Sequence, residues 1–173
     1  MRATIQSIEK ALDNKLVSAR KENLQRLADI EHRLEFVATV DGVEYINDAK
    51  STDVNSTWYS LDCLEGPVIW IASSCQFEED YALLKEVDIS NVKALIVLGE
   101  AKDEFVRRFD GRIELVTKVN TLTEAVSHAM IGSDKGDMVL FSPACSDYQN
   151  FRHYKEAGQQ FRKAVREVQL INP

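Results

Sequence analysis

The chain has 173 residues, of which 45% are hydrophobic and 28% are charged, and its formal net charge is −7 at pH 7. This length predicts one domain with one core. An acidic chain is a poor partner for nucleic acids, whose phosphates require a basic surface, so we expect no nucleic-acid binding. The apolar runs, such as Ala94–Leu98, are too short to cross a bilayer, and the N-terminus lacks a secretory pattern. We therefore expect no membrane partner and a cytoplasmic location.

The three cysteines, Cys63, Cys75 and Cys145, lie far apart with no paired spacing. An odd, dispersed set predicts no disulfide and no zinc site, and favours small buried hydrophobic residues. A nucleophilic cysteine needs an adjacent base, which the sequence does not indicate for any of the three. No cluster of His, Cys and Asp has the spacing of metal ligands elsewhere in the chain. We expect no metal site and assign no catalytic residue.

The first part of the chain predicts helices followed by a hairpin. Residues 3–13 and 16–29 have helical spacing of apolar residues. Leu34–Val40 alternates apolar and polar residues, which is typical of a strand with one exposed face. Asp41-Gly42 is a hairpin turn signal, and the return strand is Val43–Asn47.

Buried strands alternate with helices in the rest of the chain. A loop leads into a helix over residues 48–64, with Ser51, Thr52 or Asp53 as its N-cap. Further strands are predicted over residues 68–72, 92–98, 113–116 and 138–141, and further helices over residues 78–86, 102–109, 121–131 and 148–168. This order predicts an α/β fold, with a mostly parallel sheet, helices on both faces and an antiparallel N-terminal hairpin at its edge.

Charged and amide side chains gather around the predicted hairpin, where the carboxyl end of a strand would place a ligand. Arg33 and Lys50 supply positive charge. Arginine can bind a phosphate or a carboxylate through two hydrogen bonds, whereas lysine acts as a point charge. Asn47 and Asp48 can accept from a ribose or a ring amine, or can orient Lys50. Thr52, like Asn55, can donate to an oxyanion.

A structural interpretation of the same residues stays open. Asp48, Ser51 and Asp53 are also suited to capping the following helix, and Arg33 to pairing with a surface acid. His32 is more typical of a hydrogen-bonded structural residue than of a catalyst.

A second polar turn, residues 142–147, joins a buried strand to the last helix. Asp147 stands near the N-cap of that helix, which suits a capping role; ligand contact there is the functional alternative. A carboxylate at this place would repel an anionic ligand. Tyr154 is typical of a core aromatic. The chain has no phosphate-binding loop of the Gly-x-x-x-x-Gly-Lys-Ser/Thr type.

Four blocks of the sequence, in this order, resemble the C-terminal domain of Mur ligases. They are residues 31–36 (EHRLEF), 47–57 (NDAKSTDVNST), 136–146 (GDMVLFSPACS) and 158–161 (GQQF). The chain is most similar to the UDP-N-acetylmuramoyl-L-alanine–D-glutamate ligases. The resemblance covers about residues 30–170. It implies a C-terminal-like domain over residues 30–173, preceded by a helical remnant of the central domain over residues 1–29.

The resemblance implies a Rossmann-like domain that closes over the central domain, contacts ATP and binds the incoming amino acid. By position, Arg33, Asn47, Asp48 and Lys50 match the ATP-side residues, and Thr52 matches a residue near the D-glutamate site. ATP, with Mg²⁺ in the intact enzymes, is the cofactor that the family implies. The family's N-terminal and central domains are the implied partners, and they act in trans if the chain is separate.

The chain departs from the family's pattern at the amino-acid site. The family's lysine for D-glutamate is replaced by Phe77, and a serine that contacts D-glutamate is replaced by Asp147, whereas the aromatic residue is kept as Tyr154. Loss of a cationic partner should cost a dicarboxylate ligand a few kcal/mol of binding free energy, roughly hundreds-fold in affinity.

Three hypotheses about function follow. The first is a stand-alone, partly degenerate Mur ligase C-terminal domain that works as a binding or regulatory module without ligase activity of its own. The alternative is one part of a split or fragmentary ATP-dependent D-glutamate-adding ligase. The third is a nucleotide-binding domain of unrelated use.

Overall fold

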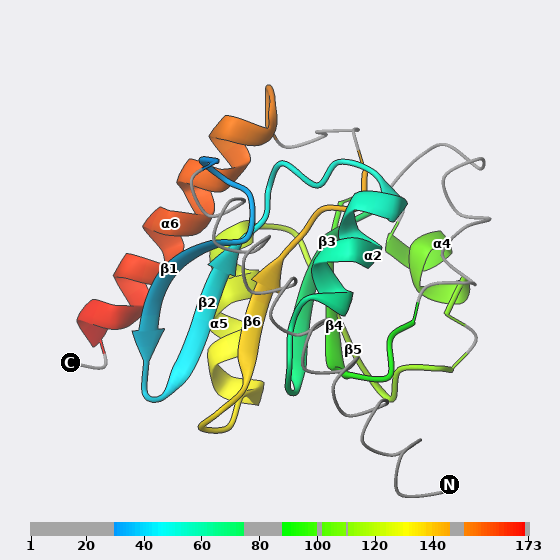
Figure 1. Ribbon diagram of the computed structural model, residues 1–173, viewed down its shortest axis with the longest axis horizontal. Coiled ribbons are helices and arrows are strands. Elements are labelled where there is room, and N and C mark those ends of the chain that lie inside the picture. Colours follow the sequence, from blue (N-terminus) through cyan, green and yellow to red (C-terminus); the bar gives the residue numbers. More distant parts are fainter. Residues whose placement is uncertain (1–29, 75–87, 100–101, 110, 146–150, 172–173) are drawn as a thin grey trace, which may run out of the picture.

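The computed structural model describes residues 30–74, 88–99, 102–109, 111–145 and 151–171. The helices predicted over residues 3–13, 16–29 and 78–86 lie outside these ranges. Six strands and four helices occur in the described part (Figure 1). In chain order they are β1 (Glu35–Val40), β2 (Val43–Asn47), α2 (Val54–Asp62), β3 (Val68–Ser73), β4 (Val92–Leu98), α4 (Lys102–Arg107), β5 (Leu115–Val119), α5 (Leu122–Gly132), β6 (Met138–Phe141) and α6 (Tyr154–Ile171).

The strands form a single six-stranded sheet in the order β1-β2-β6-β3-β4-β5. Only β1 and β2 pair antiparallel; the other neighbours pair parallel. The predicted α/β fold with an antiparallel hairpin edge is therefore confirmed. Asp41 and Gly42 both adopt positive φ, at 53° and 82°, which is the backbone twist that a two-residue hairpin turn requires.

Two hydrophobic clusters lie on opposite faces of the sheet. One joins the inner side of α2, through Val54 and Leu61, to α4 and to sheet residues such as Trp70. The other joins α5 and α6, the latter through Phe161 and Val165, to the opposite face. The helix that follows β2 therefore covers one face, and the helix that follows β6 covers the other. The carboxyl ends of β2 and β6 are therefore neighbours at a point where the helices change faces, which is where ligands bind in open α/β sheets.

Several predicted boundaries differ from the structure, two of them at the start of an element. The fifth strand begins at Leu115 rather than at residue 113, because Ile113 packs into the core ahead of the strand's pairing with β4. The last helix begins at Tyr154, whereas a helix was predicted from residue 148. Glu156 accepts from the backbone N–H of Arg152 at 2.7 Å and so binds the chain just ahead of the first turn. The α5 prediction is confirmed, with both halves of the capping box formed between Thr121 and Glu124.

The buried character of the cysteines is confirmed where they are described. Cys63 is buried and free. Cys145 is 1% exposed. Within the described residues, no helix is long and apolar enough to cross a membrane, and no group of three or more His, Cys, Asp or Glu side chains could hold a metal ion.

Candidate functional site

Three turns meet at the carboxyl ends of β2 and β6. The first, residues 30–34, precedes β1; the second, residues 48–53, joins β2 to α2; the third, residues 142–145, follows β6. Backbone hydrogen bonds join them: Lys50 N donates to His32 O at 3.0 Å, and Ala144 N donates to Ser51 O at 3.1 Å. The three turns therefore form one connected surface at the carboxyl end of the sheet.

Strained backbone concentrates at this surface. Four non-glycine residues in the described part have positive φ, and three of them are His32 (65°), Leu34 (43°) and Ala144 (59°). Each such residue costs of order 1 kcal/mol or more, and such residues cluster at binding and catalytic sites. Sequence reasoning missed this signal, because none of the three is a glycine or an asparagine.

His32 is buried among side chains of β1, β2 and α6. Its Nδ1 lies 2.8 Å from the Asn47 amide nitrogen, so in the assigned orientation Nδ1 accepts and carries no proton. Burial, and next the Arg162 guanidinium, lower the pKa of His32 from its ordinary value. The ring meets Tyr154 edge-on, with the ring centroids 6.2 Å apart. His32 is thus the structural residue that its sequence context favoured.

Asn47 is fully buried and makes its hydrogen bonds inside the protein. Its amide nitrogen also donates to Glu35 at 3.0 Å, and its carbonyl accepts from Ala49 N. Glu35 in turn pairs with Arg162 on α6 at 2.6 Å. These contacts attach the turn before β1 to the last helix.

Asp48 is also fully buried, beneath the second turn. Its Oδ1 accepts from Leu34 N at 3.1 Å, and its Oδ2 accepts from the Ser142 hydroxyl at 2.8 Å. Burial raises the pKa of Asp48, and hydrogen bonds from Ser51, Ser60, Ser142 and Leu34 oppose that rise. Asp48 does not cap α2. That role belongs to Asp53, which accepts from Ser56 N at 2.9 Å.

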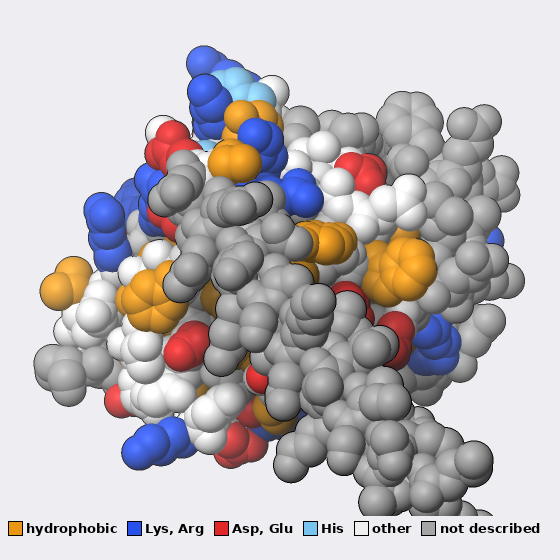
Figure 2. Space-filling view, in the orientation of Figure 1, with side chains coloured by type: hydrophobic (Ala, Val, Ile, Leu, Met, Phe, Trp, Pro, Cys, Tyr) orange, Lys and Arg blue, Asp and Glu red, His pale blue; other side chains and the backbone are white. Residues whose placement is uncertain are grey.

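The remaining candidate residues surround these two buried groups. Arg33, Lys50, Thr52 and Tyr154 are each half-buried. Arg33 and Lys50 come from the two turns that the Lys50–His32 backbone bond joins. Asp147 lies outside the described residues. Figure 2 shows basic side chains at the upper edge of the molecule, over the start of α6.

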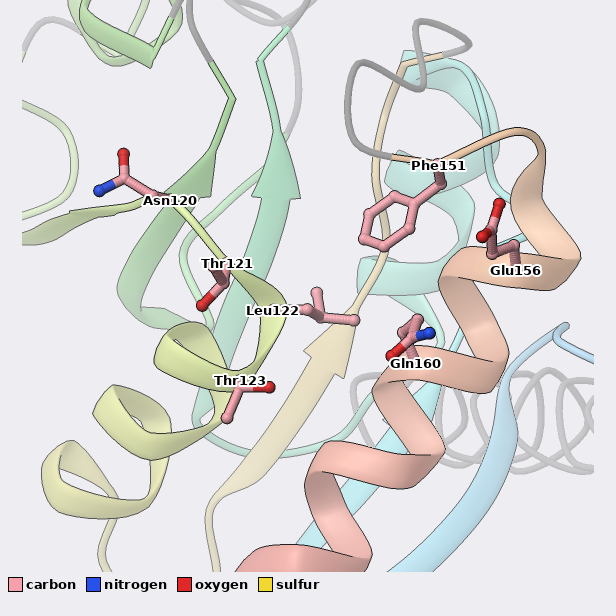
Figure 3. A pocket seen from close by; sticks show the side chains of 7 residues that line it. All are labelled: Asn120, Thr121, Leu122, Thr123, Phe151, Glu156 and Gln160. Atoms are coloured by element: carbon pink, nitrogen blue, oxygen red, sulfur yellow. The ribbon is translucent and has the colours of Figure 1, made fainter.

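A separate cavity of about 250 Å³ lies between the starts of α5 and α6. In Figure 3, Leu122 and Phe151 point toward one another across it, with Glu156 and Gln160 along the α6 side. The site residues predicted from the sequence do not line it. The N-terminus of α5 is already satisfied by its own capping box, so it is not an open anion site.

Solved structures show which class of fold this is. The chain resembles the MurF ligase from Thermotoga maritima in complex with ADP, with a TM-score of 0.54 and 13% identity over 80% of this chain and 32% of that one. It also resembles a domain from a putative UDP-N-acetylmuramate:L-alanyl-gamma-D-glutamyl-medo-diaminopimelate ligase of Haemophilus ducreyi, with a TM-score of 0.51 and 12% identity over 77% of this chain and 99% of that one. At such identities the likeness shows the fold alone.

Sequence relatives identify the family. No family model matches the chain. It is 42% identical to the UDP-N-acetylmuramoylalanine–D-glutamate ligase of Porphyromonas gingivalis over 156 residues, which are 90% of this chain and 34% of that one. It is 37% identical to the same ligase of Salinibacter ruber over 145 residues, which are 84% and 32% of the two chains. The chain belongs to the Mur ligase family, as a C-terminal domain. It spans about a third of the length of these relatives.

Proposed function

We propose that the chain provides the nucleotide-facing domain for an ATP-dependent ligase that adds D-glutamate to UDP-N-acetylmuramoylalanine in peptidoglycan precursor synthesis. The relatives are named for that reaction, and the chain matches about a third of each. One structural observation carries the proposal. The turns bearing Arg33 and Lys50 are joined through the Lys50–His32 backbone bond at the carboxyl end of β2, the end of the strands where α/β sheets bind ligands.

The candidate residues take two kinds of role in this proposal. Arg33 and Lys50 bind the ATP phosphates, because a guanidinium and an ammonium suit phosphate oxygens. Asn47 and Asp48 position these cations, since both side chains are fully buried and hydrogen-bonded inside the protein. Thr52 would face the amino acid.

Ligation requires more than these residues. Phosphoryl transfer depends on positioning and on charge stabilisation by a phosphate loop and bound Mg²⁺. The 173 residues contain no Gly-x-x-x-x-Gly-Lys-Ser/Thr sequence. We therefore propose that the chain binds nucleotide but does not ligate by itself, and that ligation requires the further domains of the family, which a separate chain would meet in trans. Residues 1–29 would then be the end of the central domain, and residues 30–173 the C-terminal domain.

A binding or regulatory module is the second candidate, favoured by the residues at the amino-acid side. Phe77 and Asp147 replace the lysine and the serine that the resemblance leads one to expect. A neutral ring in place of a cation, and a carboxylate in place of a hydroxyl, both disfavour a dicarboxylate ligand. Tyr154, kept in kind, would then pack against a different ligand.

Calorimetric titration of the chain with ATP and with ADP tests the proposal. We expect binding that Lys50→Met and Arg33→Met each weaken by about tenfold or more, because a charge-assisted contact contributes about 1.5–3 kcal/mol. Lys163→Met is the matched control, since Lys163 is exposed and pairs with Glu167 at 3.9 Å. Absence of binding, or equal loss in the control, contradicts the proposal.

A titration with D-glutamate separates the two candidates. For the regulatory module we expect negligible affinity in the natural chain and a gain of tenfold or more in a Phe77→Lys, Asp147→Ser double variant. Tight D-glutamate binding by the natural chain would remove that candidate and favour the ligase domain.

A further inference from the structure

We infer that Thr57 is a positioning residue, which acts through Ser142 and Asp48 to hold the turns 48–53 and 142–145 together as one nucleotide-facing surface. The inference deepens the proposed function and rests on it for the identity of the ligand. The contacts themselves are internal to the protein.

The three side chains form a hydrogen-bonded chain with a defined direction. The Ser142 hydroxyl donates to Asp48 Oδ2 at 2.8 Å, and an ionised carboxylate only accepts. The single hydroxyl hydrogen of Ser142 is therefore committed to Asp48. Thr57 Oγ1 lies 2.8 Å from Ser142 Oγ, so with Asp48 ionised the Thr57 hydroxyl is the donor to Ser142. Each bond polarises the next, which strengthens both.

All three side chains are at most 1% exposed and belong to three different segments. Thr57 lies on the inner side of α2, Asp48 follows β2, and Ser142 follows β6. Water does not reach them, so each lost partner leaves a buried polar group unsatisfied.

Ser142 is anchored independently of the other two. Its backbone N–H donates to Ile71 O at 3.1 Å, and its backbone oxygen accepts from the Trp70 indole at 2.8 Å. Both partners lie on β3, in the middle of the sheet. Ser142 is therefore a fixed point of the sheet against which Asp48, and with it the turn 48–53, is held.

The turn that Asp48 begins carries Lys50, and the backbone N–H of Lys50 continues the connection to His32 beside Arg33. A shift of Asp48 would separate the two turns at the 3.1 Å bond between Ala144 N and Ser51 O. The placement of both phosphate-binding cations thus depends on a hydroxyl that touches no ligand.

Amide hydrogen exchange on the whole chain tests this inference. In Thr57→Val, which keeps the shape and removes the hydroxyl, we expect the Ala144 amide to exchange about fivefold faster or more, as the loss of one buried hydrogen bond predicts. Thr57→Ser should restore the rate, because it keeps the donor. The Ala125 amide, bonded to Thr121 O at 3.0 Å in α5, reports any global loss of stability. Thr39→Val, at an exposed position of β1, is the matched control.

Titration with ADP gives the functional readout. We expect Thr57→Val to weaken ADP binding about fivefold or more, with recovery in Thr57→Ser and no change in Thr39→Val. If the natural chain binds no ADP, the proposed function fails, while the exchange rates still decide the positioning role. Should Thr57→Val not fold, Ser142→Ala breaks the same chain at its centre, and unchanged Ala144 exchange in that variant would overturn the inference. So would a Thr57→Ser variant that behaves like Thr57→Val.

Discussion

Gly158 allows the backbone of α6 to approach the His32 ring more closely than any side chain would permit. A Cβ atom built on Gly158 would lie 2.2 Å from His32 Nδ1. The same ring atom is bonded to Asn47, so the imidazole cannot turn away without losing that bond. The close approach explains why a glycine, a poor helix former, stands at the fifth position of the 18-residue helix α6.

We expect Gly158→Ala to lower the free energy of unfolding by about 1–3 kcal/mol, the usual cost of overpacking a tight contact. Gly132→Ala is the control, because nothing lies within 4 Å of a Cβ at that position of α5. It should raise the free energy of unfolding by up to about 1 kcal/mol. Urea unfolding of both variants measures the difference, and similar effects of the two substitutions would contradict the prediction.

The His32 contact also predicts a pH dependence of stability. Burial lowers the pKa of His32 in the folded protein, so the unfolded chain takes up the proton first as the pH falls. His32 therefore stabilises the fold above about pH 6.5, and this contribution is lost as the pH falls further. We expect the destabilisation caused by His32→Gln, measured in urea, to shrink between about pH 7 and pH 5. A nuclear magnetic resonance titration that placed the His32 pKa above its ordinary value would refute this.

At the scale of elements, α2 is the helix whose start is tied to the candidate site. Its N-cap, Asp53, is the last residue of the turn that carries Lys50, and its inner side carries Thr57. The α5 helix has an equally well-formed cap at Thr121, but that cap stands next to the separate cavity between α5 and α6.

These two caps allow stability to be separated from function. Asp53→Ala and Thr121→Ala should each lower the free energy of unfolding by about 1 kcal/mol. Only Asp53→Ala should also weaken ADP binding, because only that cap fixes the turn with Lys50. Thermal unfolding and ADP titration of both variants check this, and an equal loss of affinity in Thr121→Ala would mean that nucleotide binding follows general stability.

At the scale of the whole molecule, the hydrophobic clusters of the described residues begin at Leu34 and end at Val168. Both faces of the sheet are covered by helices within that span.

We expect a chain of residues 30–173 to unfold in one cooperative transition, with a melting temperature within a few degrees of that of the full chain. Thermal unfolding followed by circular dichroism measures both. A broad transition, or a melting temperature lower by about 10 °C or more, would show that residues 1–29 complete the core and would contradict the proposed domain boundary.

The sequence by itself determined the elements and their order. Alternating and continuous apolar runs predicted the strands, Asp41-Gly42 the hairpin, and the spacing of Thr121 and Glu124 the capping box of α5. These signals act over a few residues and are decided by local backbone preference and burial. The start of α6 was missed because a side chain one turn ahead binds the preceding backbone, which no periodicity reveals.

Only the tertiary structure decided what the polar residues do. Asn47 meets the backbone of Gly158 across 111 positions, and Thr57 meets Ser142 across 85. Such contacts depend on strand order, because β6 inserts between β2 and β3 and brings the last turn beside the second one. Spacing along the chain carries no record of that insertion. That spacing predicted that Asn47 and Asp48 contact a ligand, and the structure adds that both side chains are fully buried and hydrogen-bonded within the protein.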